Sequence, residues 1–93
     1  MAQIFNAIDT YGELFSVVAG MIHSVSDKAK KVEMTPDSLL VEELALDSLD
    51  LVRVIMLIED RYQLTIDLDE VPKLKCVKDV TALVDREVGR SAA

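Results

Sequence analysis

Apolar residues near the N-terminus of the chain recur at steps of three and four positions, which is the spacing of an amphipathic helix. This pattern runs from Ile4 to about Val25. Gly12 and Gly20 lie inside it, and each costs up to about 1 kcal/mol relative to alanine in a helix interior. We therefore expect a first helix in this region, with residues 1–10 forming a frayed N-terminal extension.

A second helical pattern extends from Ser48 to Tyr62. At about 100° per residue, its apolar residues divide between two faces. One face is a continuous apolar stripe that is expected to line the core. It comprises Leu51, Val54, Ile55, Ile58 and Tyr62. The opposite face mixes apolar and charged residues, namely Leu49, Val52, Arg53, Met56 and Asp60. An exposed apolar seam of this kind indicates a docking surface, and the alternative is that another helix covers it.

The remaining segments predict a long loop and two further helices. Polar and basic residues from Ser26 to Lys31, followed by Thr35-Pro36-Asp37, indicate a loop. Pro72 restricts the next helical segment to about one turn. A last helix is expected from Val77 to Gly89, where the glycine ends it and leaves residues 90–93 as a tail. No alternating strand pattern appears, so the sequence predicts an all-α fold.

Length and charge restrict the fold and the partners. With 93 residues, of which 51% are hydrophobic, the chain is expected to form a single domain over residues 1–93. Its formal net charge of −7 argues against binding to nucleic acids or to anionic membranes, because both require a basic protein surface. We therefore expect basic protein partners.

Cysteine usage and hydropathy predict a cytoplasmic protein. Cys76 is the only cysteine, so neither a disulfide nor a thiolate metal site is available, and a reducing compartment is expected. The N-terminus lacks the basic segment of a signal peptide, and the most apolar later segment, residues 51–58, is short and contains Arg53. We expect no secretion signal and no membrane span.

Ser48 is flanked by acids at the point where loop-like sequence changes to the second helix. A helix N-terminus offers unpaired backbone N–H groups and the positive end of the helix dipole. A phosphodiester on Ser48 would therefore lie in favourable electrostatics. The alternative is an ordinary N-cap or first-turn serine. A hydrolase nucleophile is not favoured, because the glycines of a Gly-x-Ser-x-Gly motif are absent.

No other residue makes a strong case for chemistry. His23 is expected to be a partly exposed residue of the first helix, and Cys76 a small buried or half-buried one. The acidic group of Asp67, Asp69 and Glu70 lacks the glycine and the bidentate glutamate of a calcium loop, so we expect solvated charges. The sequence therefore predicts no metal site and no catalytic residue.

The run Asp47-Ser48-Leu49 resembles the Asp-Ser-Leu motif of acyl carrier proteins. The spacing around the motif makes the resemblance specific, and it covers roughly residues 35–86. The matching segments are Thr35–Leu39, Val41–Leu44, Leu57–Tyr62, Leu64–Asp67 and Val77–Val80. The resemblance implies a small four-helix bundle with a long loop between its first and second helices and a short third helix. It also implies that Ser48 holds a 4′-phosphopantetheine arm, whose thiol carries acyl groups as thioesters.

The resemblance further implies a set of partners and contact residues. Asp47 is expected to engage the phosphopantetheinyl transferase that attaches the arm. Other partners are an acyl-loading ligase or transferase and a ketosynthase or acyltransferase, which meet the outer face of the second helix. The residues implied in these contacts are Leu49, Asp50, Val52, Arg53, Met56, Glu59 and Asp60. The protein is expected to be a monomer and no enzyme, with part of the alkyl chain sheltered between its second and last helices.

Several positions depart from the family pattern. Ala45-Leu46 stands where many members have Gly-Ala, and Arg53 stands where the general carriers usually have glutamate. Asp67 replaces a frequent proline, and Pro72 interrupts the usual third helix. The resemblance implies a carrier for fatty-acid, polyketide or related specialised biosynthesis, and these differences favour a dedicated carrier of a specialised pathway over the general fatty-acid carrier. The alternatives are a peptidyl or aminoacyl carrier of nonribosomal synthesis, and a helical adaptor that has lost the modification.

Overall fold

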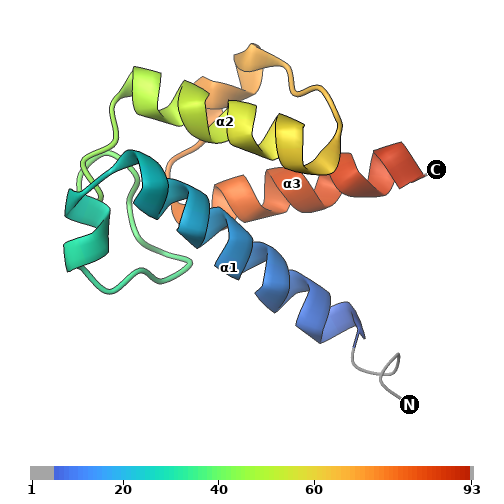
Figure 1. The fold of residues 1–93 in the computed structure, drawn as a ribbon, viewed down its shortest axis with the longest axis horizontal. Helices are drawn as coiled ribbons and strands as arrows, with labels where there is room; N and C mark the ends of the chain where they lie inside the picture. Colours follow the sequence, from blue (N-terminus) through green and yellow to red (C-terminus); the bar gives the residue numbers. More distant parts are fainter. Residues whose placement is uncertain (1–5, 93) are drawn as a thin grey trace.

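The computed structural model describes the backbone of residues 6–92 and the side chains of residues 12–89. Within these limits all regular secondary structure is helical, which confirms the predicted all-α class (Figure 1). Three α-helices form the body of the molecule and two short 3₁₀-helices lie in the connections. Their bounds are α1 Asn6–Val25, η2 Lys28–Lys31, α2 Ser48–Tyr62, η3 Leu68–Lys73 and α3 Val77–Ala92.

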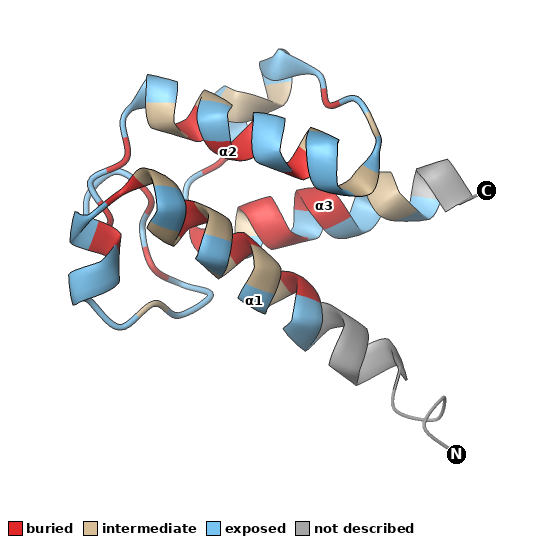
Figure 2. Cartoon of the chain, viewed as in Figure 1, coloured by how far each residue is buried: buried red, intermediate tan, exposed pale blue. Residues whose placement is uncertain are grey.

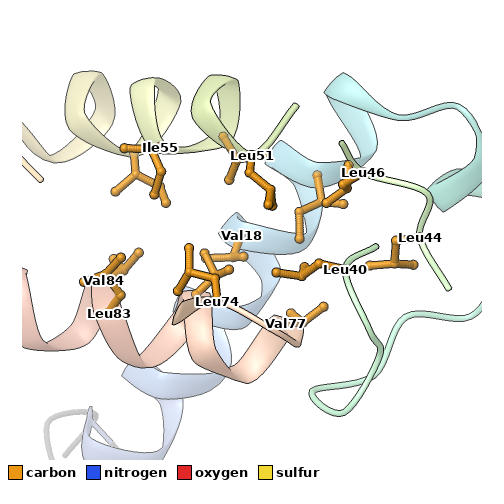
Figure 3. Packing of buried hydrophobic residues seen from close by; sticks show 14 of the residues in the cluster. Val18, Leu40, Leu44, Leu46, Leu51, Ile55, Leu74, Val77, Leu83 and Val84 are labelled. Atoms are coloured by element: carbon orange, nitrogen blue, oxygen red, sulfur yellow. The ribbon is translucent and has the colours of Figure 1, made fainter. Parts of the chain in front are cut away.

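The core lies where the three α-helices meet, with α1 crossing α2 and α3 diagonally in the view of Figure 1. Each helix contributes an apolar stripe, and the loop before α2 adds three buried leucines (Figures 2 and 3). The members from α1 and the loop are Leu14, Val18, Ile22, Leu40, Leu44 and Leu46. Those from α2 and α3 are Leu51, Val54, Ile55, Ile58, Val77, Val80, Leu83 and Val84. The predicted stripe of α2 is therefore confirmed, with Tyr62 half-buried at its end.

The last helix is longer than the sequence predicts, whereas α1 agrees with the helical pattern expected from Ile4 to Val25. The structure describes α1 from Asn6, residues 1–5 lie outside the described part, and the fraying of residues 1–10 stays a prediction. The expected end of the last helix at Gly89 is wrong, because α3 continues to Ala92. A glycine costs about 1 kcal/mol in a helix interior but removes no hydrogen bond. A single glycine therefore weakens a helix without ending it, and the helices continue through Gly12, Gly20 and Gly89.

The long connection between α1 and α2 was predicted as a loop, but it contains one helical turn, η2. Ala29 is buried at its centre, and the backbone N–H of Lys30 donates to the carbonyl oxygen of Asp27 at 3.2 Å. The following loop is tied to the start of α3 by hydrogen bonds from Leu40 N to Lys75 O (2.9 Å) and from Val77 N to Ser38 O (3.0 Å). These bonds hold the segment that leads into α2.

The third helix of the expected bundle is the 3₁₀-helix η3, which confirms that this helix is short. Asp67 caps it by accepting a hydrogen bond from Asp69 N at 2.9 Å, and Pro72 lies near its end. No residue within η3 is buried. The predicted solvated charges are partly wrong, because Asp67 is this cap and Glu70 forms ion pairs with Arg86 (3.3 Å) and Lys73 (3.8 Å). No helix in the described part is both long and apolar enough to cross a membrane.

Candidate functional site

Ser48 is the first residue of α2, and its side chain is exposed. The helix start is fixed by a capping box in which Asp50 N donates to Asp47 Oδ1 (2.8 Å) and Asp47 N donates to Asp50 Oδ2 (3.2 Å). Asp47 is therefore the N-cap, and the N-cap role left open for Ser48 does not apply. Among the described residues, the Ser48 hydroxyl has no hydrogen-bond partner. Its oxygen is free for a reaction with an external group.

The turn before α2 contains a residue in the left-handed backbone region. Ala45 has φ 59°, a conformation that costs an L-residue roughly 1–2 kcal/mol. The turn is held by hydrogen bonds from Ala45 N to Val41 O (3.2 Å) and from Leu46 N to Leu40 O (2.9 Å). Leu46 is then buried, so the chain is anchored two residues before Ser48. The position where many family members have glycine is thus one where glycine is the natural residue.

A pocket of about 330 Å³ lies beside Ser48. It is bounded by the loop before α2, the first turn of α2, and η3 with the residues that follow it. Its lining residues are Val41, Glu42, Ser48, Leu51, Val71, Pro72, Leu74 and Lys75. This volume is within the range of small-molecule sites. The exposed hydroxyl and this partly apolar pocket fit a phosphopantetheine arm. The pocket lies between α2 and η3, and the expected shelter for an alkyl chain between α2 and α3 stays a prediction.

The outer face of α2 is uncovered in the described part of the chain (Figure 2). Leu49 and Met56 each expose 59% of their surface, Arg53 and Asp60 are exposed, and Val52 is half-buried. The alternative that another helix covers this seam is therefore wrong for the described residues. Leu57, between the two faces, is also partly exposed at 39%.

Two acids of α2 that were predicted to bind partners also have structural roles, and their contact with partners stays a prediction. Asp50 is part of the capping box and also lies 3.8 Å from Arg53 Nη1, measured from its Oδ1. Glu59 Oε2 accepts a hydrogen bond from the backbone N–H of Ile66 at 2.8 Å. This bond ties the end of α2 to the chain that leads into η3. Asp60, by contrast, is exposed and forms no side-chain ion pair among the described residues.

The start of α3 uses its polar groups internally. Asp79 Oδ2 accepts hydrogen bonds from Lys75 N (2.9 Å) and Cys76 N (3.1 Å), and the Cys76 thiol lies 3.5 Å away as a third donor. The backbone N–H of Lys75 is the main cause that lowers the pKa of Asp79 below its ordinary value. Cys76 is free and buried, as predicted. The helical spacing that predicts α3 gives no indication of this cap.

The other predicted side chains stand apart from Ser48. His23 is half-buried in the last turn of α1, as expected. The described residues contain no group of three or more histidine, cysteine, aspartate or glutamate side chains suited to a metal. Lys75 of the pocket was missed, and Val41 and Glu42 were noted only within a matching segment and not as pocket residues. All three lie in irregular segments, where helical periodicity gives no indication of them.

Comparisons with known proteins agree with this geometry. A family model described as a phosphopantetheine attachment site matches residues 17–84. The acyl carrier protein of Helicobacter hepaticus is 37% identical over 70 residues, which are 75% of this chain and 90% of that protein. The acyl carrier protein of Rickettsia canadensis is 37% identical over 76 residues (82% and 87%), and that of Brachyspira hyodysenteriae is 37% identical over 73 residues (78% and 88%). The chain therefore belongs to the phosphopantetheine-binding family of acyl carrier proteins.

Proposed function

We propose that Ser48 is the residue to which the phosphopantetheine arm is attached, and that the protein delivers acyl groups to partner enzymes without catalysing a reaction itself. One observation carries the proposal. Ser48 combines an exposed hydroxyl that has no partner in the described structure with a rigidly capped helix start and an adjacent pocket of about 330 Å³. When bound, the arm supplies a thiol for thioester formation.

The attachment step transfers the arm from coenzyme A. The Ser48 Oγ forms a bond to the β-phosphorus, and the bond from that phosphorus to the oxygen bridging the two phosphates breaks. The hydroxyl proton leaves Ser48, and adenosine 3′,5′-bisphosphate departs with the electron pair of the broken bond. Among the residues of this chain, Asp47 is the acid next to Ser48 and is exposed, so it can meet the basic surface of a magnesium-dependent transferase.

The pocket supports a role in cargo handling. Leu51, Val71 and Leu74 give it apolar walls, whereas Glu42 and Lys75 contribute charges. Part of an alkyl chain held here would be removed from water, which favours burial by about 25 cal/mol per Å² of apolar surface. Pro72 lies in the wall and stops η3 from lengthening, so this short helix sets the room available to the cargo.

The outer face of α2 is the proposed docking surface. Leu49 and Met56 supply its exposed apolar area, and Asp60 supplies negative charge for basic enzymes. The proposed enzymes are a phosphopantetheinyl transferase, an acyl-loading ligase or transferase, and a ketosynthase or acyltransferase. Arg53 reverses the usual charge within this face and is exposed, which supports a dedicated carrier of a specialised pathway. We also propose that the protein is a monomer and works in the cytoplasm, where the arm thiol stays reduced.

The relatives support acyl cargo over the two alternatives. The similar proteins are named acyl carrier proteins, and their names give no support to a peptidyl carrier. An unmodified adaptor is disfavoured because the attachment-site family model spans residues 17–84 and Ser48 remains accessible. The experiment below separates these cases.

The test is incubation of the apo protein with a broad-specificity transferase, magnesium and coenzyme A, followed by intact-mass measurement. Wild type is expected to gain one phosphopantetheine, and Ser48→Ala none. Ser16→Ala is the matched control, since Ser16 is an exposed serine on α1, and it should gain one. If the folded wild type stays unmodified with several transferases, the adaptor interpretation is correct and the proposal is wrong.

A further inference from the structure

Negative charge is concentrated at the start of α2. The carboxylates of Asp47 and Asp50 form the capping box on either side of Ser48. A phosphodiester on Ser48 would add a third negative charge, and charges of like sign at such short range repel each other. One backbone donor of the first turn, Asp50 N, is already used by Asp47. These two carboxylates therefore weaken the favourable electrostatics expected at the helix N-terminus, and a nearby cation would stabilise the phosphodiester.

Lys75 is the one basic residue among those that line the pocket beside Ser48. Its side chain is exposed, and it forms no ion pair within the described part of the chain. The other cations of this region are engaged: Lys73 with Glu70 (3.8 Å), Lys78 with Asp37 (2.9 Å) and Arg53 with Asp50 (3.8 Å). Lys75 thus differs from its neighbours in having its charge available.

The backbone of Lys75 is held in place on both sides. Its N–H donates to Asp79 Oδ2 at 2.9 Å, and its carbonyl oxygen accepts from Leu40 N at 2.9 Å. These two bonds fix the base of the side chain between the start of α3 and the loop before α2. Lys75 lines the pocket, and lysine binds phosphate groups as a point charge on a flexible stem.

We propose that Lys75 is a positioning residue whose ammonium group pairs with the phosphodiester on Ser48 and draws the base of the arm over the pocket between α2 and η3. This inference rests on the proposed attachment at Ser48. The phosphodiester is the ligand rather than an acidic cargo, because it is always attached directly to the Ser48 oxygen at the pocket, whereas cargo at the far end of the arm comes to the pocket only when the arm folds back. Glu42, in the same pocket, is the anion that competes for Lys75.

The test compares apo and holo forms of wild type, Lys75→Gln, Lys75→Arg and Lys73→Gln, with loading driven to completion and verified by mass. Lys73→Gln is the matched control, because it removes the same charge two residues away. At low salt, attachment of the arm should lower the Tm of Lys75→Gln by about 2–4 °C more than that of wild type. Lys75→Arg and Lys73→Gln should behave as wild type, and the difference should disappear at high salt.

Two further measurements exclude a merely structural role. The ³¹P resonance of the holo protein should shift in Lys75→Gln and stay unchanged in Lys73→Gln. Glu42→Gln should raise the Tm of the holo form relative to the apo form, since it removes the competitor. Two results would overturn the inference. One is the same change in Tm from apo to holo form in Lys75→Gln and Lys73→Gln. The other is a loss of Tm in Lys75→Gln that is equal with and without the arm. Failure of the proposed function would be seen earlier, as the absence of any arm on wild type.

Discussion

The two faces of α2 belong to one helix of 15 residues but have different surroundings. On the inner face, Ile58 is completely buried and packs with residues of the other helices. On the outer face, Met56 exposes 59% of its surface although it is equally apolar in character. The comparison shows that apolar residues on one helix lie in two different environments. The inner face stabilises the fold, and the outer face, which begins near Ser48, is exposed and is the proposed docking surface.

The largest expected effect separates the two faces directly. Ile58→Ala should lower the free energy of unfolding by about 2–5 kcal/mol, because it leaves a cavity in the core. Met56→Ala should cost well under that amount, since its side chain is mostly in water. Denaturant unfolding monitored by circular dichroism measures both. Equal losses for the two variants would show that the assignment of faces is wrong.

A second comparison concerns the acids at the end of α2. Glu59→Ala removes the acceptor for the Ile66 N–H and should cost about 1–3 kcal/mol, because a partly buried donor loses its charged partner. Asp60→Ala, on exposed surface, should stay within about 0.5 kcal/mol of wild type. The same unfolding measurement applies. Equal losses of unfolding free energy in Asp60→Ala and Glu59→Ala would show that the assignment of a structural role to Glu59 alone is wrong.

The turn that leads into α2 offers a gain in stability. Ala45→Gly should raise the free energy of unfolding by about 0.5–1 kcal/mol, because glycine relieves the left-handed backbone at φ 59° by more than it adds to the entropy of the unfolded chain. The control is Ala82→Gly in the exposed part of α3, which should lose about 1 kcal/mol. A lower free energy of unfolding in both variants would show that the backbone of Ala45 is not strained.

Substitution of Arg53 is expected to have the smallest effect on stability but a large effect on the reaction rates of partner enzymes. Arg53→Glu should leave the fold nearly unchanged, improve the rates of general fatty-acid synthesis enzymes, and weaken transfer by the cognate pathway enzyme. Lys30→Glu makes the same charge change on η2, away from the outer face of α2, and should alter neither rate. Steady-state rates with the holo forms decide the matter. Unchanged rates for Arg53→Glu would show that Arg53 is not part of the docking surface.

The helix that bears the site was predictable, because its signals are local. The bounds Ser48–Tyr62 and the division into faces follow from periodicity, and the structure confirms them. The expected end of the last helix at Gly89 was wrong, because a glycine costs about 1 kcal/mol in a helix interior and weakens a helix without ending it.

The features that sequence reasoning missed depend on contacts between distant segments. Ala29 is buried in η2 only because the loop folds back over the core. Glu59 accepts a hydrogen bond from the Ile66 N–H, where the chain turns back after α2. A helical pattern gives no indication of this contact. Lys75 reaches the neighbourhood of Ser48 because Leu40 bonds to its carbonyl oxygen, 35 positions away in the sequence. The motif therefore identified the serine, whereas the pocket beside it required the fold.

The central claim is that Ser48, at the start of the outer face, carries the arm, and a neighbouring serine allows it to be tested within one peptide. Cleavage after Lys31 and Arg53 releases residues 32–53, which contain both Ser38 and Ser48. Ser38 is buried, and its hydroxyl accepts a hydrogen bond from Thr35 N at 2.9 Å. After treatment with transferase and coenzyme A, fragment masses of this peptide should place the whole added mass on Ser48. Added mass on Ser38, or divided between the two serines, would contradict the account.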